Sequence, residues 1–511
     1  MRRLLSVLLL TCFAFGCSHD RPTNGSATGT PLGKPAKPNI IYILADDLGY
    51  GDLGSYGQQK IATPTLDRLA RHGMRFTDHY AGSTVCAPSR CVLMTGKHAG
   101  RCFMRGNYHD KATGYTIAMP ADEPSLPRLL KSAGYSTACV GKWGLGPPAS
   151  SSDPNTFGFD FFYGFLDQRH AHNHYPDYLW RNDKRELTGN VMTDESRVSV
   201  LGAGVAVKRV AYANDLFFKE SQRWIAEQAK QGRPFFLYLA LTVPHANNEA
   251  NRLVRLMPED ARDQRGQEVP DFGPYADKDW TGPNKGQAAM ITRFDAQIGE
   301  MVKQLESLGL AEDTLIVFTS DNGPHAEGGN DPAFFDANGP LRGIKRDLYE
   351  GGIRVPMIAY WPGTIAAGYE TDHISSFQDV LPTFADLAGV RVPEGVTGIS
   401  FAPSLLKFAE GRFASTPLWD REEQRPHKFL YWEFFEQRGK QAVRMGKWKG
   451  VRLNVQRDKD GPIQLYDLST DPGETNNIAD QHPDVVAEID RIMSEAHTMS
   501  AAEQWRYDWE K

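Results

Sequence analysis

Short apolar segments alternate with amphipathic segments along most of this chain, and that alternation limits the folds available to it. Residues 40–44 read Ile-Ile-Tyr-Ile-Leu, an apolar run long enough for one buried strand. Residues 63–73 begin with Thr-Pro, place two leucines and an alanine on one helical face, and end at a glycine. Similar segments follow up to about residue 395. The pattern predicts an α/β fold with a mostly parallel sheet flanked by helices.

The remaining elements are predicted from the same signals. Strands are expected at 135–140, 235–241, 314–319 and 355–361, and helices at 125–134, around 298–305 and at 379–388. After about residue 395 the pattern changes to short aromatic strands at 429–432 and 442–444, with a helical end at 483–500. We therefore expect a main domain over 38–395 and a smaller C-terminal α+β subdomain over 396–511.

The overall charge excludes one class of partner. The 511 residues are 41% hydrophobic and 23% charged, with a formal net charge of -6. A chain without a basic surplus cannot neutralise many phosphates, so nucleic acid is not expected as a main partner. An anionic ligand with few charges is not excluded, since a few local cations suffice to bind it.

The first residues have the features of an export signal. Arg2 and Arg3 precede an apolar run that is too short to span a bilayer and ends at Gly16-Cys17. Residues 14–17 resemble a bacterial lipoprotein box, so residues 1–17 are expected to be a signal peptide and Cys17 the lipidated first residue. Plain secretion is the alternative. Residues 18–37, rich in Ser, Thr, Gly and Pro, are predicted to be a flexible tether. The protein would then be periplasmic or on a bacterial cell surface, with a lipid as its only membrane contact.

Four cysteines follow this region: Cys86, Cys91, Cys102 and Cys139. An even number in an exported protein could form two disulfides, but a core of this size does not need them. Cys139 lies within a predicted apolar strand and is expected to be a buried thiol.

Polar residues follow four predicted strands at the points where these end. Asp46-Asp47 follow the first strand and Asp321-Asn322 a later one, while a lysine and a histidine end two others. In open α/β sheets, ligands bind at the carboxyl ends of the strands. Adjacent carboxylates repel unless a cation lies between them, and oxygen ligands suit Ca²⁺ or Mg²⁺. The sequence therefore predicts a divalent-metal site at this edge, although each pair alone could be a solvated turn.

A second motif lies at residues 86–96, which read Cys-Ala-Pro-Ser-Arg-Cys-Val-Leu-Met-Thr-Gly. If the residues after Cys86 continue as a helix, Cys86 lies near a helix N-terminus, where partial positive charge favours an anion. Arg90 adds a fork of donors suited to sulfate oxygens. An isolated cysteine in such a place is more often a buried small residue, but the complete run is specific.

This run resembles the signature of the formylglycine-dependent type I sulfatases of the alkaline phosphatase superfamily. Matching runs extend the resemblance over nearly the whole chain: 39–47, 141–146, 244–245, 320–323, 341–356 and 379–389. The resemblance implies an enzyme that hydrolyses sulfate esters, expected to be those of a sulfated polysaccharide or oligosaccharide. It also implies a maturation enzyme, formylglycine-generating or anaerobic, that converts Cys86 to formylglycine.

The resemblance also implies the site residues. The implied ligands of a metal, usually calcium with magnesium as the alternative, are Asp46, Asp47, Cys86, Asp321 and Asn322. The residues implied to contact the sulfate or the nucleophile are Arg90, Lys142, His245 and Lys345. A protonated group, His245 or Lys345, would then give a proton to the leaving alcohol.

One position departs from the family pattern. The family often has Gly-Lys-Trp-His-Leu-Gly, whereas residues 141–146 read Gly-Lys-Trp-Gly-Leu-Gly. Gly144 has no side chain to move a proton, so another group would have to replace that histidine. The segment 169–174, Arg-His-Ala-His-Asn-His, is a candidate source, and His172 is its candidate substrate residue. On a strand its histidines would share one face; a surface loop is the alternative.

Two other functions stay open on the sequence. One is a formylglycine-dependent phosphonate or phosphate ester hydrolase of the same superfamily. The other is an inactive, lipid-anchored protein that holds sulfated glycans without cleaving them, which only Gly144 favours.

Overall fold

A computed structural model describes residues 37–511 apart from 111–112 and 408–422. The predicted signal peptide, the lipoprotein box and the tether up to residue 36 lie outside the described residues. Within the described ranges, no helix combines the length and the apolar composition that crossing a bilayer requires.

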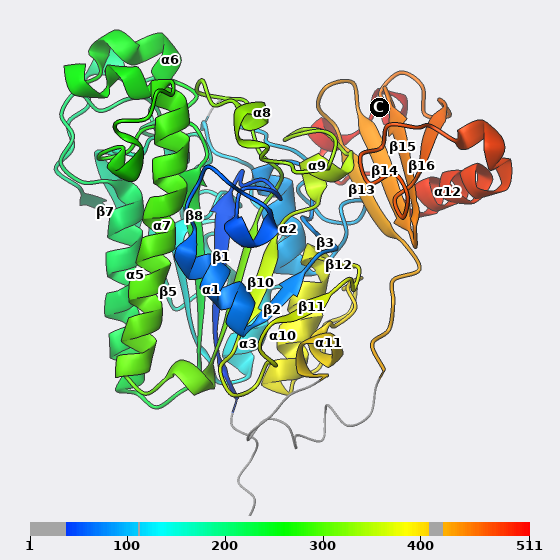
Figure 1. The fold of residues 1–511 in the computed structure, drawn as a ribbon, viewed down its shortest axis with the longest axis horizontal. Coiled ribbons are helices and arrows are strands. Elements are labelled where there is room, and N and C mark those ends of the chain that lie inside the picture. Colours follow the sequence, from blue (N-terminus) through cyan, green and yellow to red (C-terminus); the bar gives the residue numbers. More distant parts are fainter. Residues whose placement is uncertain (1–36, 111–112, 408–422) are drawn as a thin grey trace, which may run out of the picture. The chain divides into compact units, whose positions relative to one another are not determined.

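A ten-stranded mixed sheet forms the centre of the fold (Figure 1), in the order β11-β2-β10-β9-β1-β8-β4-β5-β6-β7. In that order the strands are β11 (Tyr369–Thr371), β2 (Met74–Phe76), β10 (Met357–Tyr360), β9 (Thr314–Ser320), β1 (Asn39–Asp46), β8 (Phe235–Pro244), β4 (Ser136–Lys142), β5 (Phe161–Phe165), β6 (Tyr178–Arg181) and β7 (Lys184–Leu187). The central strands β9, β1, β8, β4 and β5 run parallel. Their carboxyl ends therefore meet at one edge of the sheet.

The predicted fold class is confirmed: the central strands are parallel, and β11 and β2 form a further parallel pair at one edge. Strand β10 is antiparallel to both of its neighbours, and β6 and β7 add antiparallel pairs at the other end. An apolar run shows that a strand is buried but not in which direction it runs. The sequence therefore predicted β10 without predicting its orientation.

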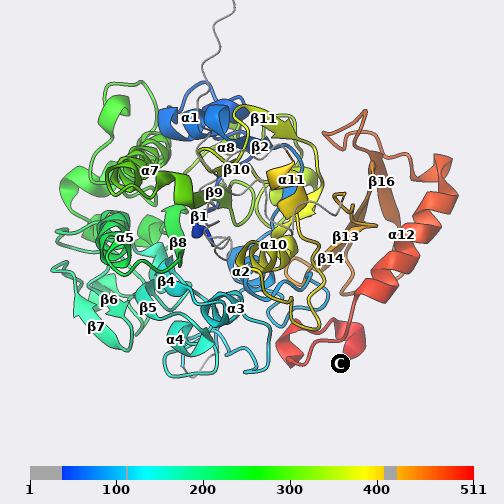
Figure 2. The same cartoon turned by 90° about the horizontal axis from the view of Figure 1, so that it is seen from below.

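Helices cover both faces of this sheet (Figure 2). One face packs against α1 (Pro64–His72), α5 (Ala213–Ala229) and α7 (Gly282–Ser307). The other packs against α2 (Cys86–Thr95), α3 (Leu126–Ser132) and α10 (Val380–Ala388). Alternate residues of β1 supply the two cores, since Ile41 and Ile43 point to the first and Tyr42 and Leu44 to the second. Strand residues alternate in this way because of the pleat.

Short elements complete the main part of the chain. They are the helices α4 (Pro154–Phe157), α6 (Ala250–Leu253), α8 (Pro332–Phe335), α9 (Glu350–Ile353) and α11 (Ala402–Leu406), and the parallel pair β3 (His79–Tyr80) and β12 (Ser375–Ser376).

A separate antiparallel sheet lies in the C-terminal region. It contains β13 (Leu430–Phe434), β14 (Lys440–Met445), β15 (Trp448–Leu453) and β16 (Ile463–Asp467), followed by α12 (Pro483–Ala496). Trp432 donates its indole N–H to the carbonyl oxygen of Ala81 at 2.9 Å. Lys449 reaches Glu350 at 2.7 Å, and both side chains are fully buried. These contacts hold the small sheet against the segment that leads into α2 and against α9.

The described cysteines do not pair. Cys86, Cys91, Cys102 and Cys139 are all buried and free. Cys139 lies in β4 with no exposed surface, as the sequence predicted. The large core makes disulfides unnecessary for stability.

Candidate active site

The strand ends bring the predicted polar residues to one edge of the sheet. Asp46 is the last residue of β1 and Lys142 the last of β4. Asp321 follows β9 and His245 follows β8. Because these four strands are parallel neighbours, their carboxyl ends lie together. Four residues from distant parts of the sequence thus share one site, at the place where open α/β sheets bind ligands.

Cys86 begins α2 and faces this edge. Val85 before it is extended, and Cys86 is the first helical residue, with 1% of its surface exposed. Its Sγ lies 3.4 Å from Oδ1 of Asp46. Burial, with Asp46 adding to it, raises the pKa of the Cys86 thiol to about 12. The unmodified thiol is therefore protonated at neutral pH and a poor nucleophile.

Arg90 lies one turn further along α2, on the same face as Cys86. Its Nε and Nη2 donate to Oδ2 of Asp321 at 3.1 and 2.9 Å, and its Nη1 donates to the carbonyl oxygen of Lys142 at 2.7 Å. The guanidinium is fully buried. It therefore fixes the ends of two strands relative to the helix that carries Cys86.

Two buried lysines neutralise the aspartate pair. Lys142 Nζ lies 2.6 Å from Asp46 Oδ2, and Lys345 Nζ lies 2.8 Å from Asp47 Oδ2. Burial works against the charge on Asp46, but Lys142 and Arg90 hold its pKa well below the usual range. Lys345 comes from the loop before α9, far along the chain from Asp47. The structure thus places every predicted site residue in or beside one cluster.

The oxygen atoms of this cluster fit a divalent metal ion. Ligand atoms of Asp46, Asp47, Cys86 and His245 lie within 4.8 Å of one another. Oδ1 of Asn322 is buried and has no hydrogen-bond partner among the residues that the structure describes. Burial and the nearby Asp46 raise the pKa of Asp321 to about 7. An orphaned acceptor beside mutually repelling carboxylates is the arrangement that a bound cation would stabilise.

Asp47 adopts a backbone conformation that supports this arrangement. Its φ of 68° lies in the left-handed region, which is uncommon for a residue with a side chain. Its N–H donates to Oδ1 of Asp321 at 3.1 Å, and Nδ2 of Asn322 donates to its Oδ1 at 2.7 Å. The chain thus turns sharply after β1, and both carboxylates of the pair stay at the site.

Three hydrogen-bonding contacts fix the position of His245. Its Nδ1 donates to the carbonyl oxygen of Ala246 at 2.6 Å, and its own carbonyl accepts from His174 Nε2 at 2.9 Å. Its Nε2 lies 3.0 Å from Nζ of Lys345. Burial and the neighbouring Lys345 cation hold the pKa of His245 well below its usual range. The imidazole is therefore neutral and rigidly placed.

The histidine-rich segment is neither of the two structures considered on the sequence. Residues 170–172 form a turn of 3₁₀ helix. His170 is buried against Phe165 and Tyr178, whereas His172 stacks on His245 with ring centroids 4.6 Å apart. The strand interpretation was wrong because successive histidines here point in different directions. His172 nevertheless lies at the site.

The space beside Gly144 is already occupied. A Cβ atom at Gly144 would lie 2.1 Å from Nε2 of Gln168, and the φ of Gly144 is 71°. Gln168 donates to the carbonyl oxygen of Gly144 at 3.3 Å, and its Oε1 is buried without a partner. A side chain at position 144 would thus collide with a glutamine from the chain segment after β5.

Several residues of the site were missed on the sequence. Glu327 bonds to Lys345 at 3.0 Å, and His325 forms a further group of metal-type ligands with Asp47 and Glu327. Glu249 bonds to His172. The only signal was their position three to five residues after a strand-end motif, which does not distinguish them from ordinary loop charges.

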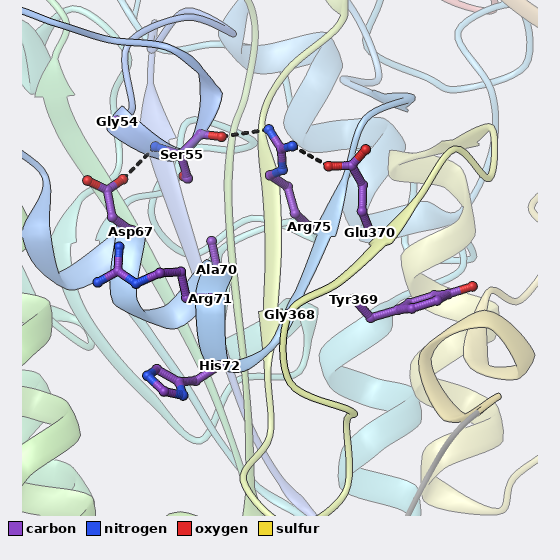
Figure 3. A pocket seen from close by; sticks show the side chains of 10 residues that line it. All are labelled: Gly54, Ser55, Asp67, Ala70, Arg71, His72, Arg75, Gly368, Tyr369 and Glu370. Carbon is purple, nitrogen blue, oxygen red and sulfur yellow. Dashed lines mark hydrogen bonds and ion pairs between the residues drawn. The ribbon is translucent and has the colours of Figure 1, made fainter.

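A surface cavity of about 660 Å³ lies elsewhere, at the β11–β2 edge of the sheet (Figure 3). Arg75 donates to the carbonyl oxygen of Ser55 at 2.6 Å and pairs with Glu370. Asp67 on the other wall accepts from the Ser55 N–H. The acidic and basic groups of the cavity balance one another, and none of the predicted site residues lines it. The cavity is therefore separate from the candidate active site.

Comparison with known proteins identifies the family. The Sulfatase family matches residues 38–390, and N-sulphoglucosamine sulphohydrolase, C-terminal, matches residues 344–499. Arylsulfatase A of Bos taurus is 31% identical over 518 residues, which cover 93% of this chain and 90% of the relative. N-acetylgalactosamine-6-sulfatase of Mus musculus is 30% identical over 495 residues, covering 91% and 86%.

A solved structure agrees with these relatives. The crystal structure of Ps i-CgsB in complex with k-i-k-neocarrahexaose has a TM-score of 0.70 and 28% identity, covering 90% of this chain and 92% of that one. The chain therefore belongs to the sulfatase family of the alkaline phosphatase superfamily and is a sulfuric ester hydrolase.

Proposed function

We propose that this sulfatase removes sulfate from a sulfated polysaccharide or oligosaccharide, using formylglycine at position 86 and a bound Ca²⁺, with Mg²⁺ as the alternative. The observation that carries the proposal is the position of Cys86. It begins a helix, is buried, and touches Asp46 at the centre of the oxygen-rich cluster. Since the thiol itself is a poor nucleophile there, conversion to an aldehyde gives this position a chemical role.

The residues around position 86 take distinct roles in the proposal. Formylglycine would supply hydroxyl groups for attack on sulfur, and the metal would draw negative charge from sulfate oxygens. Asp46, Asp47, Asp321 and Asn322 would hold the metal. Lys142 and Arg90 keep Asp46 and Asp321 in place by the contacts described above. Lys345 and His245, fixed before substrate arrives, would meet the sulfate oxygens.

A glycan substrate is supported by the relatives. One relative is named for an N-acetylgalactosamine 6-sulfate, and the solved structure of another holds a neocarrahexaose. The intact cluster around Cys86 and both pairs of strand-end residues argues against an inactive binding protein. A phosphonate or phosphate ester hydrolase would need its own support, and no feature of the site favours it over a sulfatase.

We also propose the organisation and location that the sequence suggested. A catalytic domain over 38–395 would precede an α+β subdomain over 396–511, behind a signal peptide and a tether. Lipid attachment at Cys17 would hold the enzyme at a bacterial membrane facing the periplasm or the exterior. Wild-type protein should then partition into a detergent phase and Cys17→Ser protein should not. Equal partition of the two proteins would refute the anchor.

Peptide mass spectrometry tests the proposed chemistry. The tryptic peptide 76–90 from protein made with a maturation enzyme should be lighter by about 18 Da at Cys86, the difference between a thiol and an aldehyde. Turnover of 4-nitrophenyl sulfate should appear with this mass change. It should be lost in Cys86→Ala, while the melting temperature stays close to wild type. An unmodified thiol in fully active enzyme, or full activity of Cys86→Ser, would contradict the proposal.

A further inference from the structure

A tight turn of the chain presents Lys345 to the site, and the following inference concerns what holds that turn in place. It rests on the proposed function, in which Lys345 meets the sulfate oxygens. The N–H of Asp347 donates to the carbonyl oxygen of Ile344 at 2.8 Å, which closes a turn with Lys345 and Arg346 at its centre. Because Lys345 is a central residue of this turn, the direction of its side chain depends on the shape of the turn.

The turn has a conformation that its sequence does not favour. The φ of Arg346 is 74°, whereas the φ of Lys345 is not positive. A positive φ at the third residue alone is the pattern of a type II turn, which favours glycine or asparagine at that position. An arginine in this left-handed conformation brings its Cβ too close to the backbone and is strained. The surrounding structure must therefore hold the turn in this shape.

Two backbone hydrogen bonds tie the turn to the main part of the chain. The N–H of Lys345 donates to the carbonyl oxygen of Pro324 at 2.9 Å, and the N–H of Arg346 donates to the carbonyl oxygen of Thr84 at 3.1 Å. Pro324 follows β9 and Thr84 precedes α2. The turn is thus attached to two of the segments that build the site.

Lys440 holds the same turn from the C-terminal sheet. It is the first residue of β14 and is 8% exposed. Its Nζ donates to the carbonyl oxygen of Arg346 at 2.7 Å and to Oδ1 of Asp347 at 3.0 Å. It also donates to Oε1 of Gln437, in the loop between β13 and β14, at 2.9 Å. All three N–H donors of the ammonium group are therefore used, two of them on the turn.

Asp347 connects this lysine to the closure of the turn. Its Oδ2 accepts from the N–H of Ile344 at 3.2 Å, while its Oδ1 accepts from Lys440. One carboxylate thus spans the turn from its last residue to its first. Hydrogen bonds between charged partners are about twice as strong as those between neutral ones, so the lysine fixes the orientation of this carboxylate firmly.

We propose that Lys440 is a positioning residue for the reaction. It holds the turn 344–347, and through that turn it holds the ammonium group of Lys345 in the arrangement that meets the sulfate. Burying an ammonium group costs free energy unless its hydrogen bonds are made, and two of the three that Lys440 makes go to this turn. The C-terminal sheet thereby sets the geometry of a group in the active site of the main domain.

The first variant removes the contact from the side of the sheet. Lys440→Met keeps a long unbranched side chain without N–H donors, so the strained turn should relax and displace Lys345. Because a misplacement of about 1 Å can cost about 100-fold in rate, we expect kcat/KM for 4-nitrophenyl sulfate to fall by about 10-fold to 100-fold. The inhibition constant of inorganic sulfate, used as a probe of binding at the same site, should rise as well.

Two backgrounds at position 346 separate the turn from general stability. Arg346→Gly and Arg346→Ala both lack the guanidinium group, but only glycine adopts a positive φ without strain. In the Arg346→Gly background the turn should keep its shape without Lys440, so adding Lys440→Met should lower kcat/KM by a much smaller factor. In the Arg346→Ala background the strain remains, and the full loss is expected.

Lys449→Met is the matched control, because Lys449 is a buried lysine of the same sheet that pairs with Glu350 instead of the turn. Its effects on melting temperature and turnover should be the same in both backgrounds. If Lys440→Met does not fold, Asp347→Ala opens the same turn from a side chain that is 34% exposed, and the same comparison of backgrounds applies.

An equal loss on adding Lys440→Met to the glycine and alanine backgrounds would overturn the proposal, because Lys440 would then act only on stability. Unchanged kcat/KM and unchanged inhibition by sulfate in Lys440→Met would overturn it as well. Mature wild-type enzyme that does not hydrolyse aryl sulfates would instead refute the proposed function itself.

Discussion

The charge state of Asp321 shows how a single residue at this site depends on the charges around it. It is fully buried, it lies near Asp46 and Asp47, and only the guanidinium of Arg90 reaches its Oδ2. Burial and the negative neighbours raise its pKa to about 7. In protein without metal, protonated Asp321 contributes to the free energy of unfolding at pH values below its ordinary pKa. This contribution is lost as the pH rises through about 7.

A metal ion should reverse that loss. If Asp321 is a metal ligand, as we propose, it must be ionised to bind, so its proton would compete with the metal below about pH 7. We expect the rise in melting temperature on adding Ca²⁺ to chelator-treated protein to be larger at about pH 8 than at about pH 6. Asp321→Asn keeps an oxygen ligand without the titration and should show less difference between the two pH values. An equal rise in the melting temperature of the wild-type protein at both pH values would contradict this explanation.

At the scale of elements, helix α1 depends on a residue from another helix. Asp295 of α7 accepts from the backbone N–H groups of Thr65 and Leu66 at 3.0 and 2.8 Å. These are two of the donors that the first turn of α1 leaves without partners inside the helix. The cap is thus supplied by tertiary contact, and the side chain of Thr63 does not cap the helix itself.

Removal of this cap should destabilise the protein without touching the active site. Asp295→Ala should lower the free energy of unfolding by about 1–2 kcal/mol, the range found for loss of a helix N-cap. Asp295→Asn retains one acceptor and should cost less. Denaturant unfolding measures both, and turnover of an aryl sulfate serves as the control. A larger loss for Asn than for Ala would show that Asp295 does not act as a cap.

The same cap illustrates what a sequence can and cannot predict. Pro64 and Gly73 marked the ends of α1 correctly because helix boundaries are encoded locally. Likewise Asp46 and Asp321 could be placed at strand ends from the apolar runs before them. The partner of a loop charge, such as Glu327 for Lys345, depends on how distant segments meet. No local pattern predicts such a pair.

The replacement at Gly144 is a further example. The sequence showed that a side chain was absent, but Gln168 comes from a different loop and its approach depends on the backbone of both. The three-residue turn at 170–172 was also beyond prediction, because alternating histidines suit a strand as well as a loop. His172 was nevertheless named as a site residue because several histidines followed one another closely.

On the scale of the whole molecule, the C-terminal sheet belongs to the core of the enzyme. One buried apolar cluster combines residues from both parts of the chain: Tyr80, Val85, Leu348, Tyr349, Ile353, Leu430, Trp432, Phe434, Ala442, Val451, Tyr466 and Leu468. Glu350 lies beside this cluster and receives Lys449 at 2.7 Å and the hydroxyl of Tyr80 at 2.6 Å. Loss of the sheet would remove Lys449 and Arg444 and leave this buried carboxylate with Arg354 at 3.4 Å.

Protein ending at residue 395 should therefore fail to form a stable enzyme. The truncation would expose Tyr80 and Val85 before α2 and Ile353 in α9, and it would remove Lys449 from Glu350. We expect aggregation, or a strongly lowered melting temperature together with loss of aryl sulfate turnover. Lys449→Met is the matched point variant and should show the same direction of effect. A soluble, active 38–395 fragment would show instead that the small sheet is an accessory.

The burial of Cys86 also limits the period during which another protein could modify this residue. The whole of α2 is buried, and the thiol is 1% exposed, so no second protein can reach it once the core has closed. If Cys86 is converted to formylglycine as we propose, the conversion would have to happen on a chain that is still unfolded. In that case folding and modification would compete, and a molecule that folds before it is modified would stay inactive. The specific activity of a preparation would then depend on the fraction of molecules modified before folding, as well as on the turnover of each modified molecule.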